Sequence, residues 1–355
     1  MQKDTADKTS KDAPNGPRSF WGVLGGDGKL SNLPWAVRAI IGILFVALLI
    51  LAISAIYLTV PPGEEPGVAI NYPQEWDFGW DVIKAIDSGV EWVIITGDPL
   101  FDAIRAVIVW ILVNFRDFLL WLPWWLVIVG TGIMSWRAVS RRFGIVSLGF
   151  LGIIALMGLI DLLMMTLAIT LTATLLCVAI GIPVGILAAR SDRFEGILRP
   201  ALDAMQTMPS FVYLIPALML FGLGMTPAVM ATMIYAIPPL IRLTNLGIRQ
   251  VDASVVEAAK SFGATPWQML VKVQIPLAMP TVLAGLNQTV MMALAMVVIA
   301  SMIGAEGLGT EILTGIARLE VGRGFLGGIS IVFTAIILDR VSQGFVKKPE
   351  VKQAA

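Results

Sequence analysis

The chain has 355 residues, of which 57% are hydrophobic and only 14% are charged, and its formal net charge is zero. A soluble domain of this size needs more charge on its surface, so the composition indicates an integral membrane protein and provides no basic field for nucleic acid. The sequence has no His and a single Cys, which excludes imidazole acid–base chemistry and intrachain disulfides and argues against a zinc site.

Long apolar stretches predict an all-α integral membrane fold, because a chain crossing lipid must satisfy its backbone polar groups within a helix. About eight transmembrane helices are predicted, at 35–59, 122–136, 144–160, 162–189, 211–225, 227–246, 278–303 and 325–341. Residues 1–33 are charged and carry Gly, Pro and Ser, which is typical of a disordered tail. The helix within 34–60 could alternatively be a cleaved signal sequence, but its apolar run is long for one.

The segment 61–121 has ten acidic and three basic residues, which favours an extracytoplasmic location. Within it, 81–94 and 98–121 carry apolar residues at helical spacing and are predicted to be amphipathic helices at the membrane interface. Four charged residues leave 98–121 too few apolar positions to cross: Asp102, Arg105, Arg116 and Asp117. If it did cross, the N-terminal tail would lie outside.

Basic residues cluster in alternate loops of the predicted core, 122–345, and this distribution predicts its orientation. They occur at 137–142, at 190–200, within and beside the loop 247–277 and near the C-terminal tail, 346–355. With eight crossings all of these segments lie on one side. Both termini and the loop 247–277 are therefore predicted to be cytoplasmic.

Residues 257–276, EAAKSFGATPWQMLVKVQIP, are polar and helical in pattern between two apolar spans. Acids in the early turns of the first helix suit its dipole, and Gly263 either ends that helix or lets another backbone approach closely. Pro266 suits the first turn of a second helix, which Pro276 is expected to end. The stretch could be only a solvated connection, but connections elsewhere in the chain are shorter, and we favour a partner-docking element.

The pattern E-A-A, three residues, G, nine residues, V-Q-I-P in this stretch resembles the EAA motif of permease subunits of ATP-binding cassette (ABC) importers. The resemblance implies a cytoplasmic coupling helix that contacts a separate ATPase subunit. The residues that it places at this contact are Glu257, Ala258, Ala259, Ser261, Phe262 and Gly263.

Residues 200–224, 261–309 and 335–340 resemble the glycine betaine/proline betaine permeases of the ProW type, and the likeness covers about 75–345. It implies a permease core of the MetI-like kind in a bacterial cytoplasmic (inner) membrane, with an extra N-terminal helix at 34–60. The implied function is ATP-driven import of quaternary-ammonium osmolytes, of the glycine betaine, proline betaine or choline class. Such a chain is a transporter subunit and not an enzyme.

The same resemblance implies the partners: two copies of a cytoplasmic ATP-binding subunit, a second copy of this permease and an extracytoplasmic substrate-binding protein. ATP and Mg would bind the partner ATPase, and no cofactor is expected on this chain. The stretch GDGKL at 26–30 lacks the spacing and the hydroxyl of a phosphate-binding loop, in agreement with this division of labour.

Polar residues at or within the spans are candidates for the substrate pathway: Gln206, Thr207, Asn287, Gln288 and Thr289. Hydrogen bonding between helices is the alternative for each of them. A quaternary ammonium is usually held in an aromatic cage, and the core has only Tyr213 and Tyr235. The high-affinity site is therefore expected on the binding protein.

Three alternatives remain at this point. The chain could be an ABC permease for another small solute. An ion-coupled secondary transporter is a different class; no predicted span has an acid near its centre for a proton relay, but sodium coupling through unwound backbone stays open. A membrane scaffold or intramembrane enzyme is the third, and the residues for catalysis are scarce.

Overall fold

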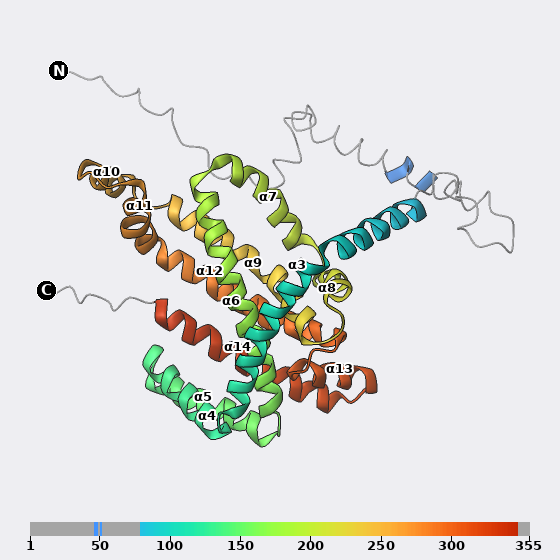
Figure 1. Ribbon diagram of the computed structural model, residues 1–355. Helices are drawn as coiled ribbons and strands as arrows, with labels where there is room; N and C mark the ends of the chain where they lie inside the picture. The colour runs from blue at the N-terminus through green and yellow to red at the C-terminus, as the bar shows by residue number, and fades with distance from the viewer. Residues whose placement is uncertain (1–45, 49, 52–78, 347–355) are drawn as a thin grey trace, which may run out of the picture. The chain divides into compact units, whose positions relative to one another are not determined.

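The computed structural model of the chain describes residues 46–48, 50–51 and 79–346. The tails 1–33 and 347–355, most of the helix predicted within 34–60 and residues 61–78 lie outside the described residues. The chain divides into two units, Met1–Asp87 and Ser88–Ala355. The described part of the second unit contains helices and turns without a strand, which confirms the predicted all-α class (Figure 1).

From residue 79 onward the elements follow one another closely along the chain. They are α3 (Gly79–Trp121), α4 (Trp124–Ala138), α5 (Arg141–Leu156), α6 (Ile160–Arg190), α7 (Asp192–Thr207), η3 (Ser210–Tyr213), α8 (Leu214–Phe221), α9 (Met225–Arg249), α10 (Ala253–Ser261), α11 (Pro266–Gln268), η4 (Met269–Gln274), α12 (Ile275–Ala300), η5 (Ser301–Ile303), α13 (Leu308–Arg318) and α14 (Val321–Val346).

Four helices in the described residues are long and apolar enough to cross a membrane: α6, α9, the continuous stretch Pro266–Ile303 that contains α12, and α14. They coincide with the predicted spans 162–189, 227–246, 278–303 and 325–341. The number rises to six if each of two bent helix pairs forms one span. The expectation of about eight helices is roughly consistent with this architecture.

The other predicted core spans correspond to helices of 16 residues or fewer. α4 and α5 have 15 and 16 residues, and α8 has eight and follows α7 across a bend of 111°. Local chemistry sets these lengths: Ser140 caps the start of α5, and Gly158, with φ of 73°, follows its end. At 1.5 Å per residue α4 extends only about 22 Å, less than the hydrocarbon core.

Residues 81–94 and 98–121, predicted as two helices, form the single 43-residue helix α3, so the prediction of a break was wrong. Pro99 lies inside this helix. A proline removes one backbone hydrogen bond and kinks a helix, but it does not have to end it. The later part packs on the bundle, where Ile108 and Leu112 are buried among residues of α6 and α9. α3 is bent by 100° from α4.

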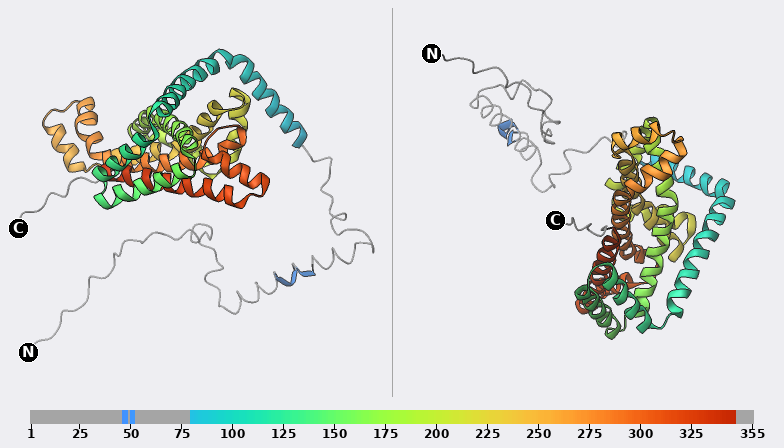
Figure 2. Two further views of the ribbon diagram at one scale, coloured as in Figure 1. Left: turned by 90° about the horizontal axis from the view of Figure 1, so that it is seen from below. Right: turned by 90° about the vertical axis from the view of Figure 1, so that its left-hand side faces the viewer.

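Close approach of α9 to both α6 and α12 organises the bundle. A Cβ atom on Gly185 of α6 would lie 2.6 Å from the Cβ atom of Thr244, and one on Gly285 of α12 would lie 2.9 Å from that of Leu243. Neither site has room for a side chain, so the glycines allow the backbones to pack closely. α10 and α11 continue from α9 and α12 and extend away from the neighbouring helices (Figure 2, left).

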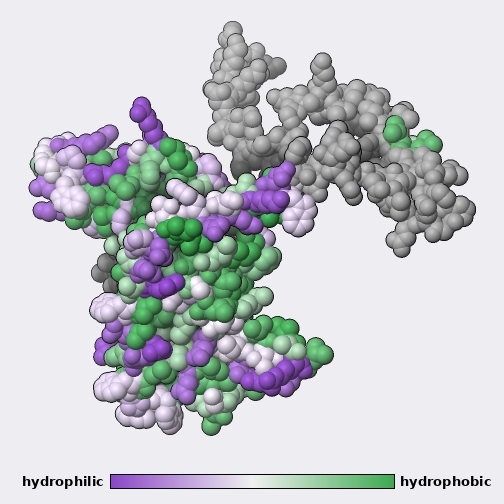
Figure 3. Space-filling model, turned by 45° about the vertical axis from the view of Figure 1, so that its right-hand side comes forward, coloured by the Kyte–Doolittle hydropathy of each residue, from purple (hydrophilic) through white to green (hydrophobic). Residues whose placement is uncertain are grey.

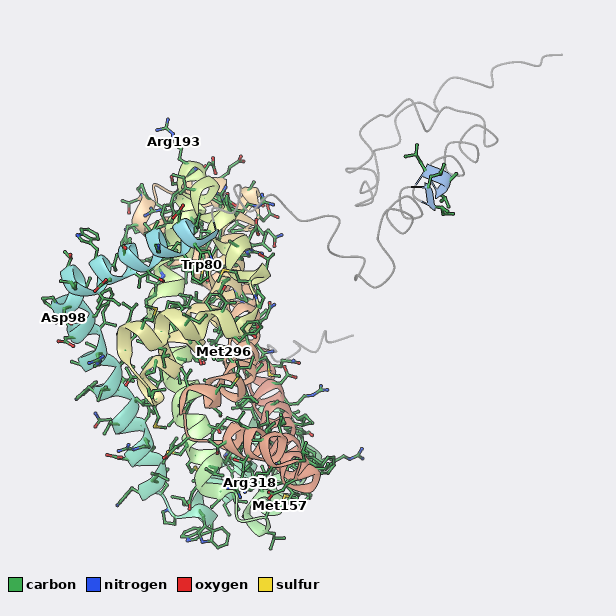
Figure 4. The ribbon with its side chains drawn as sticks, turned by 90° about the vertical axis from the view of Figure 1, so that its right-hand side faces the viewer. Trp80, Asp98, Met157, Arg193, Met296 and Arg318 are labelled. Carbon is green, nitrogen blue, oxygen red and sulfur yellow. The ribbon has the colours of Figure 1, made fainter. Side chains whose placement is uncertain are left out.

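The surface of the bundle is apolar over a wide area. Large hydrophobic side chains are exposed along its helices, for example Ile145, Leu187 and Ile215, and hydrophobic residues cover much of the middle of the face in Figure 3. In water such a patch would drive aggregation, whereas in lipid it is the expected surface. Figure 4 shows Arg193 at one end of the bundle and Met157 and Arg318 at the opposite end.

We predict that Gly185→Leu separates α6 from α9 and destabilises the fold by about 1–3 kcal/mol, the usual cost of overpacking. A lower melting temperature of the detergent-purified protein would show this. Gly149→Leu is the matched control, because a Cβ atom at Gly149 meets nothing within 4 Å. Equal melting temperatures for the two variants would contradict the close packing of α6 on α9.

Candidate functional site

The hairpin formed by α10, α11 and η4 begins with a side-chain cap. Asp252 is the N-cap of α10, and its Oδ1 accepts a hydrogen bond from the backbone N–H of Ser254 at 2.8 Å. Hydrogen bonds from the Ser254 side chain and backbone lower the pKa of Asp252 below its usual value. The carboxylate therefore stays charged at neutral pH and keeps the cap. The cap weakens only as the pH falls through that lowered pKa.

The first helix of the hairpin ends at Gly263. This residue has a φ of 78°, its N–H donates to the Lys260 carbonyl at 2.9 Å, and the Ala264 N–H donates to the Ala259 carbonyl at 3.1 Å. This pair of bonds is the Schellman motif, in which glycine takes the left-handed conformation at low cost. Of the two roles considered for Gly263, the structure shows helix termination.

The second helix begins with a reciprocal cap that the sequence reading missed. Thr265 Oγ1 accepts from the Gln268 backbone N–H at 3.3 Å, and Gln268 Oε1 accepts from the Thr265 backbone N–H at 2.9 Å. Pro266 occupies the first turn between them, as expected. The signal was present, since Thr-x-x-Gln is the pattern of a capping box.

Pro276 does not end the second helix, contrary to our prediction. Residues Met269–Gln274 form a π turn in which the Ile275 N–H bonds to the Leu270 carbonyl, and α12 follows directly. A π turn shifts the backbone hydrogen-bond register by one residue. Pro276, which has no N–H to donate, lies just after this shift, so the helix continues through it. The hairpin is therefore joined to the membrane helix without a flexible break.

The coupling residues implied by the resemblance lie together at the tip of the hairpin. Glu257, Ala258, Ala259 and Ser261 are on α10, Phe262 is its C-cap, and Gly263 follows. None of the residues of α10 is buried. Phe262 is 92% exposed and Trp267 is 67% exposed. Two large exposed aromatic side chains, on a hairpin with well-formed caps, mark a surface that a protein partner can cover.

The root of the hairpin, by contrast, is anchored. Met269 and Leu270 are buried, and Leu270 belongs to a core cluster with residues of α6, α7, α9 and α12. The root of the hairpin is therefore held to the helices of the bundle through packed side chains.

A charged network, also missed from the sequence, ties the α6–α7 corner to the end of α9 just before the hairpin. The Arg249 guanidinium contacts Asp192 at 2.7 Å and Glu195 at 3.1 Å, and it donates to the Ala188 carbonyl at 2.8 Å. Asn245 links Arg249 to Glu195 by further hydrogen bonds. Arg242 pairs with Asp203 about two turns away along α9 and α7. The sequence did contain a signal for this network, because α7 has three acidic residues and the end of α9 is basic.

The pathway candidates are in different environments. Asn287 donates to Asp339 Oδ1 at 2.8 Å and accepts from Ser342, so it joins α12 to α14. Gln288 is exposed, and Thr289 is fully buried with no hydrogen-bond partner among the described residues. Successive residues turn by about 100°, so these three cannot share one face of α12.

Gln206 and Thr207 lie in the last turn of α7 and are exposed, and the Thr207 hydroxyl donates to the Ala204 carbonyl in the same helix at 3.1 Å. For Asn287 the structure shows the alternative role, hydrogen bonding between helices.

Comparisons with known proteins identify the family of the chain. Residues 181–349 match the family described as the binding-protein-dependent transport system inner membrane component. The chain is 50% identical over 258 residues to the glycine betaine/proline betaine transport system permease protein ProW of Escherichia coli (strain K12), an alignment that covers 73% of each chain. It is 43% identical over 265 residues to the glycine betaine transport system permease protein OpuAB of Bacillus subtilis (strain 168), covering 74% of this chain and 94% of that one.

Among solved structures, the inward-facing MetNI methionine ABC transporter aligns with 51% of this chain and 91% of the matched chain, at 20% identity and a TM-score of 0.47.

A bundle of long apolar helices with a capped polar hairpin at one end defines a multi-pass membrane permease. The chain belongs to the family of inner-membrane permease components of binding-protein-dependent ABC importers, as its EAA motif predicted. Its relatives are transporter subunits rather than enzymes. Membership in this family implies a separate ATP-binding subunit, which binds the nucleotide, and an external binding protein.

We predict that Thr265→Val removes half of the capping box and destabilises the start of the second helix by about 1 kcal/mol. Faster amide hydrogen exchange at residues 266–270 would show this. Ser261→Ala is the control, because the Ser261 hydroxyl donates only to the Glu257 carbonyl within α10. Unchanged exchange in Thr265→Val would show that the capping box does not hold this turn.

Proposed function

We propose that this permease imports quaternary-ammonium osmolytes of the glycine betaine, proline betaine or choline class, using ATP hydrolysed on its partner subunit. The capped, exposed α10–α11 hairpin carries the ATP-driven part of the proposal, because it offers a docking surface continuous with two membrane helices. The solute class is supported by the 50% and 43% identical relatives, whose names specify glycine betaine and proline betaine.

The hairpin acts as the coupling element in this proposal. Phe262 and Ala258 enter a cleft in the ATP-binding subunit, with Glu257, Ala259, Ser261 and Gly263 around them. When two such subunits close on ATP, they draw the hairpins of two permease copies together, and the bundle changes from inward-facing to outward-facing as rigid bodies. The unbroken helix from Pro266 to Ile303 supports this mechanism, because a rigid connection transmits displacement.

The proposed assembly contains two copies of this chain, two ATP-binding subunits and one extracytoplasmic binding protein, which holds the high-affinity site. The rings of Tyr213 and Tyr235 contact each other edge-on with centroids 6.0 Å apart, and the Tyr213 hydroxyl donates to the Met205 carbonyl. These tyrosines are engaged in the core, which favours a binding-protein cage over one in this chain. Gln206, Thr207, Asn287, Gln288 and Thr289 remain pathway candidates, and Asn287 also hydrogen-bonds between α12 and α14.

The proposed orientation places the α10–α11 hairpin, the α4–α5 turn and both termini in the cytoplasm. The basic loops at 137–142 and 190–200 support it through the preference of Lys and Arg for the cytoplasmic side. The later part of α3 does not have the interfacial location predicted for 98–121, because Ile108 and Leu112 pack among residues of the long helices α6 and α9 and the helix runs along the bundle in Figure 4.

We predict that proteoliposomes holding the permease and its ATP-binding subunit take up glycine betaine only with ATP inside the compartment that contains the hairpin, and only with the binding protein outside. Uptake driven by a sodium gradient without ATP would refute the proposal in favour of a secondary transporter. Uptake of an unrelated solute, with glycine betaine rejected, would retain the ABC permease and remove the solute class.

We predict that Gly263→Trp abolishes uptake and co-purification of the ATP-binding subunit, because the bulky side chain projects into the docking surface. Nothing in this chain lies within 4 Å of a Cβ atom at Gly263, so the bundle should fold. Gly263→Ala is the matched control, since it shares the strain of positive φ without the bulk. Normal uptake by Gly263→Trp, or equal loss in both variants, would contradict a docking role for this surface.

A further inference from the structure

A groove of about 370 Å³ lies between α4 and α5, within the size range of roughly 300–1,000 Å³ that is typical of ligand sites. Apolar side chains line it along both helices: Val129, Ile133, Ile145 and Leu148. Trp136 and Arg141 line it near the α4–α5 turn, and Arg141 is the charged residue of the lining. The groove is therefore apolar along its length and cationic near that turn.

Two glycines create the depth of the groove. A Cβ atom on Gly144 would lie 3.0 Å from the Gly132 carbonyl oxygen, so the two backbones approach closely and leave a channel beside them. The opposite side of the same hairpin buries Ile128, Leu151 and Ile154 in a cluster with residues of α6 and α14. The groove consequently faces away from the bundle, and Ile145 within it is 70% exposed.

Three arginines surround the turn: Arg137, Arg141 and Arg142. The Arg141 guanidinium carbon lies 5.5 Å from the centre of the Trp136 ring, which holds this cation at the mouth of the groove. Within residues 79–346, no carboxylate forms an ion pair with any of the three arginines. Like charges so close together favour an anion from outside the chain.

We propose that this groove binds one anionic phospholipid of the cytoplasmic leaflet, with an acyl chain along the apolar channel and the phosphate at Arg141 and Arg142. The inference rests on the orientation given above, which places the α4–α5 turn at the cytoplasmic surface. The basic cluster at the cytoplasmic surface matches the anionic headgroup of such a lipid, and the apolar helix surface beside it matches an acyl chain. The ligand is held without any covalent step.

Other occupants fit the groove less well. A zwitterionic lipid fills the channel but leaves the three cations without a net counter-charge. A second copy of this chain, packed about a two-fold axis on this face, would bring two arginine clusters together, and like charges across an interface are costly. A soluble anion would neutralise the turn but leave the apolar channel empty.

The test uses the purified permease with its ATP-binding subunit, equilibrated with equimolar phosphatidylglycerol and phosphatidylcholine and read by native mass spectrometry. The wild-type complex should retain phosphatidylglycerol in preference to phosphatidylcholine. The double variant Arg141→Gln/Arg142→Gln should lose this preference, by roughly fivefold for each arginine. Arg193→Gln, which removes an exposed cytoplasmic arginine far from the groove, should retain it.

A bulky side chain in the apolar channel tests whether an acyl chain lies there. Ile145→Trp should reduce binding of both lipids, whereas Val146→Trp, at the adjacent exposed position outside the groove, should not. An unchanged preference in the double arginine variant, or an equal loss in Arg193→Gln, would overturn the proposal. So would displacement of the lipid by glycerol phosphate alone, or a disulfide between two copies of Ile145→Cys, since Cys177 is buried and cannot compete.

The measurement of bound lipid by mass spectrometry does not depend on transport activity. Labelling of Arg142→Cys from outside intact cells would refute the orientation, and with it the proposed leaflet. A loss of lipid preference without such labelling leaves the proposed function unaffected. The two proposals can therefore fail separately.

Discussion

The packing of α9 against α6 and α12 is the constraint on which the rest of the structure depends. Glycine at 185 and 285 lets three backbones approach to distances that no side chain would permit. α9 is the helix that enters the α10–α11 hairpin, and α12 is the helix that leaves it. The position and tilt of the hairpin are consequently set by this contact, and a change in the angle between α9 and α12 must move Phe262 and Gly263 as well.

Polar chemistry in the bundle mainly stabilises helices and their connections. The hydroxyls of Thr170 and Thr172 donate to carbonyls four residues earlier in α6, and Thr166 Oγ1 also accepts the N–H of Leu308 at the start of α13. Asn287 is used in the same way between α12 and α14. A polar residue in an apolar span is thus weak evidence for a substrate pathway, because a polar group in lipid must first find a partner within the protein.

The two ends of the bundle carry different kinds of interaction. At the end near Arg193, Arg249 joins the α6–α7 corner to α9 beside the hairpin. At the opposite end, Arg323 at the start of α14 contacts Glu311 of α13 at 2.6 Å through its Nε atom. The hydrogen bond from Arg323 lowers the pKa of Glu311 and keeps this pair charged at neutral pH. Each end of the bundle is therefore fastened by an arginine that pairs with acids of a neighbouring helix.

The sequence by itself determined the membrane class, the four long helices and the two-helix character of the segment 253–274. These follow from composition and from residues within one or two helical turns of one another, such as Asp252 with Ser254 or Thr265 with Gln268. Only the tertiary structure decided that α3 continues through Pro99, that the helix continues through Pro276 and that Asn287 pairs with Asp339, 52 residues away. Hydrogen-bond registers around a proline and the helix faces that meet depend on the packed neighbours, and no local pattern in the chain encodes them.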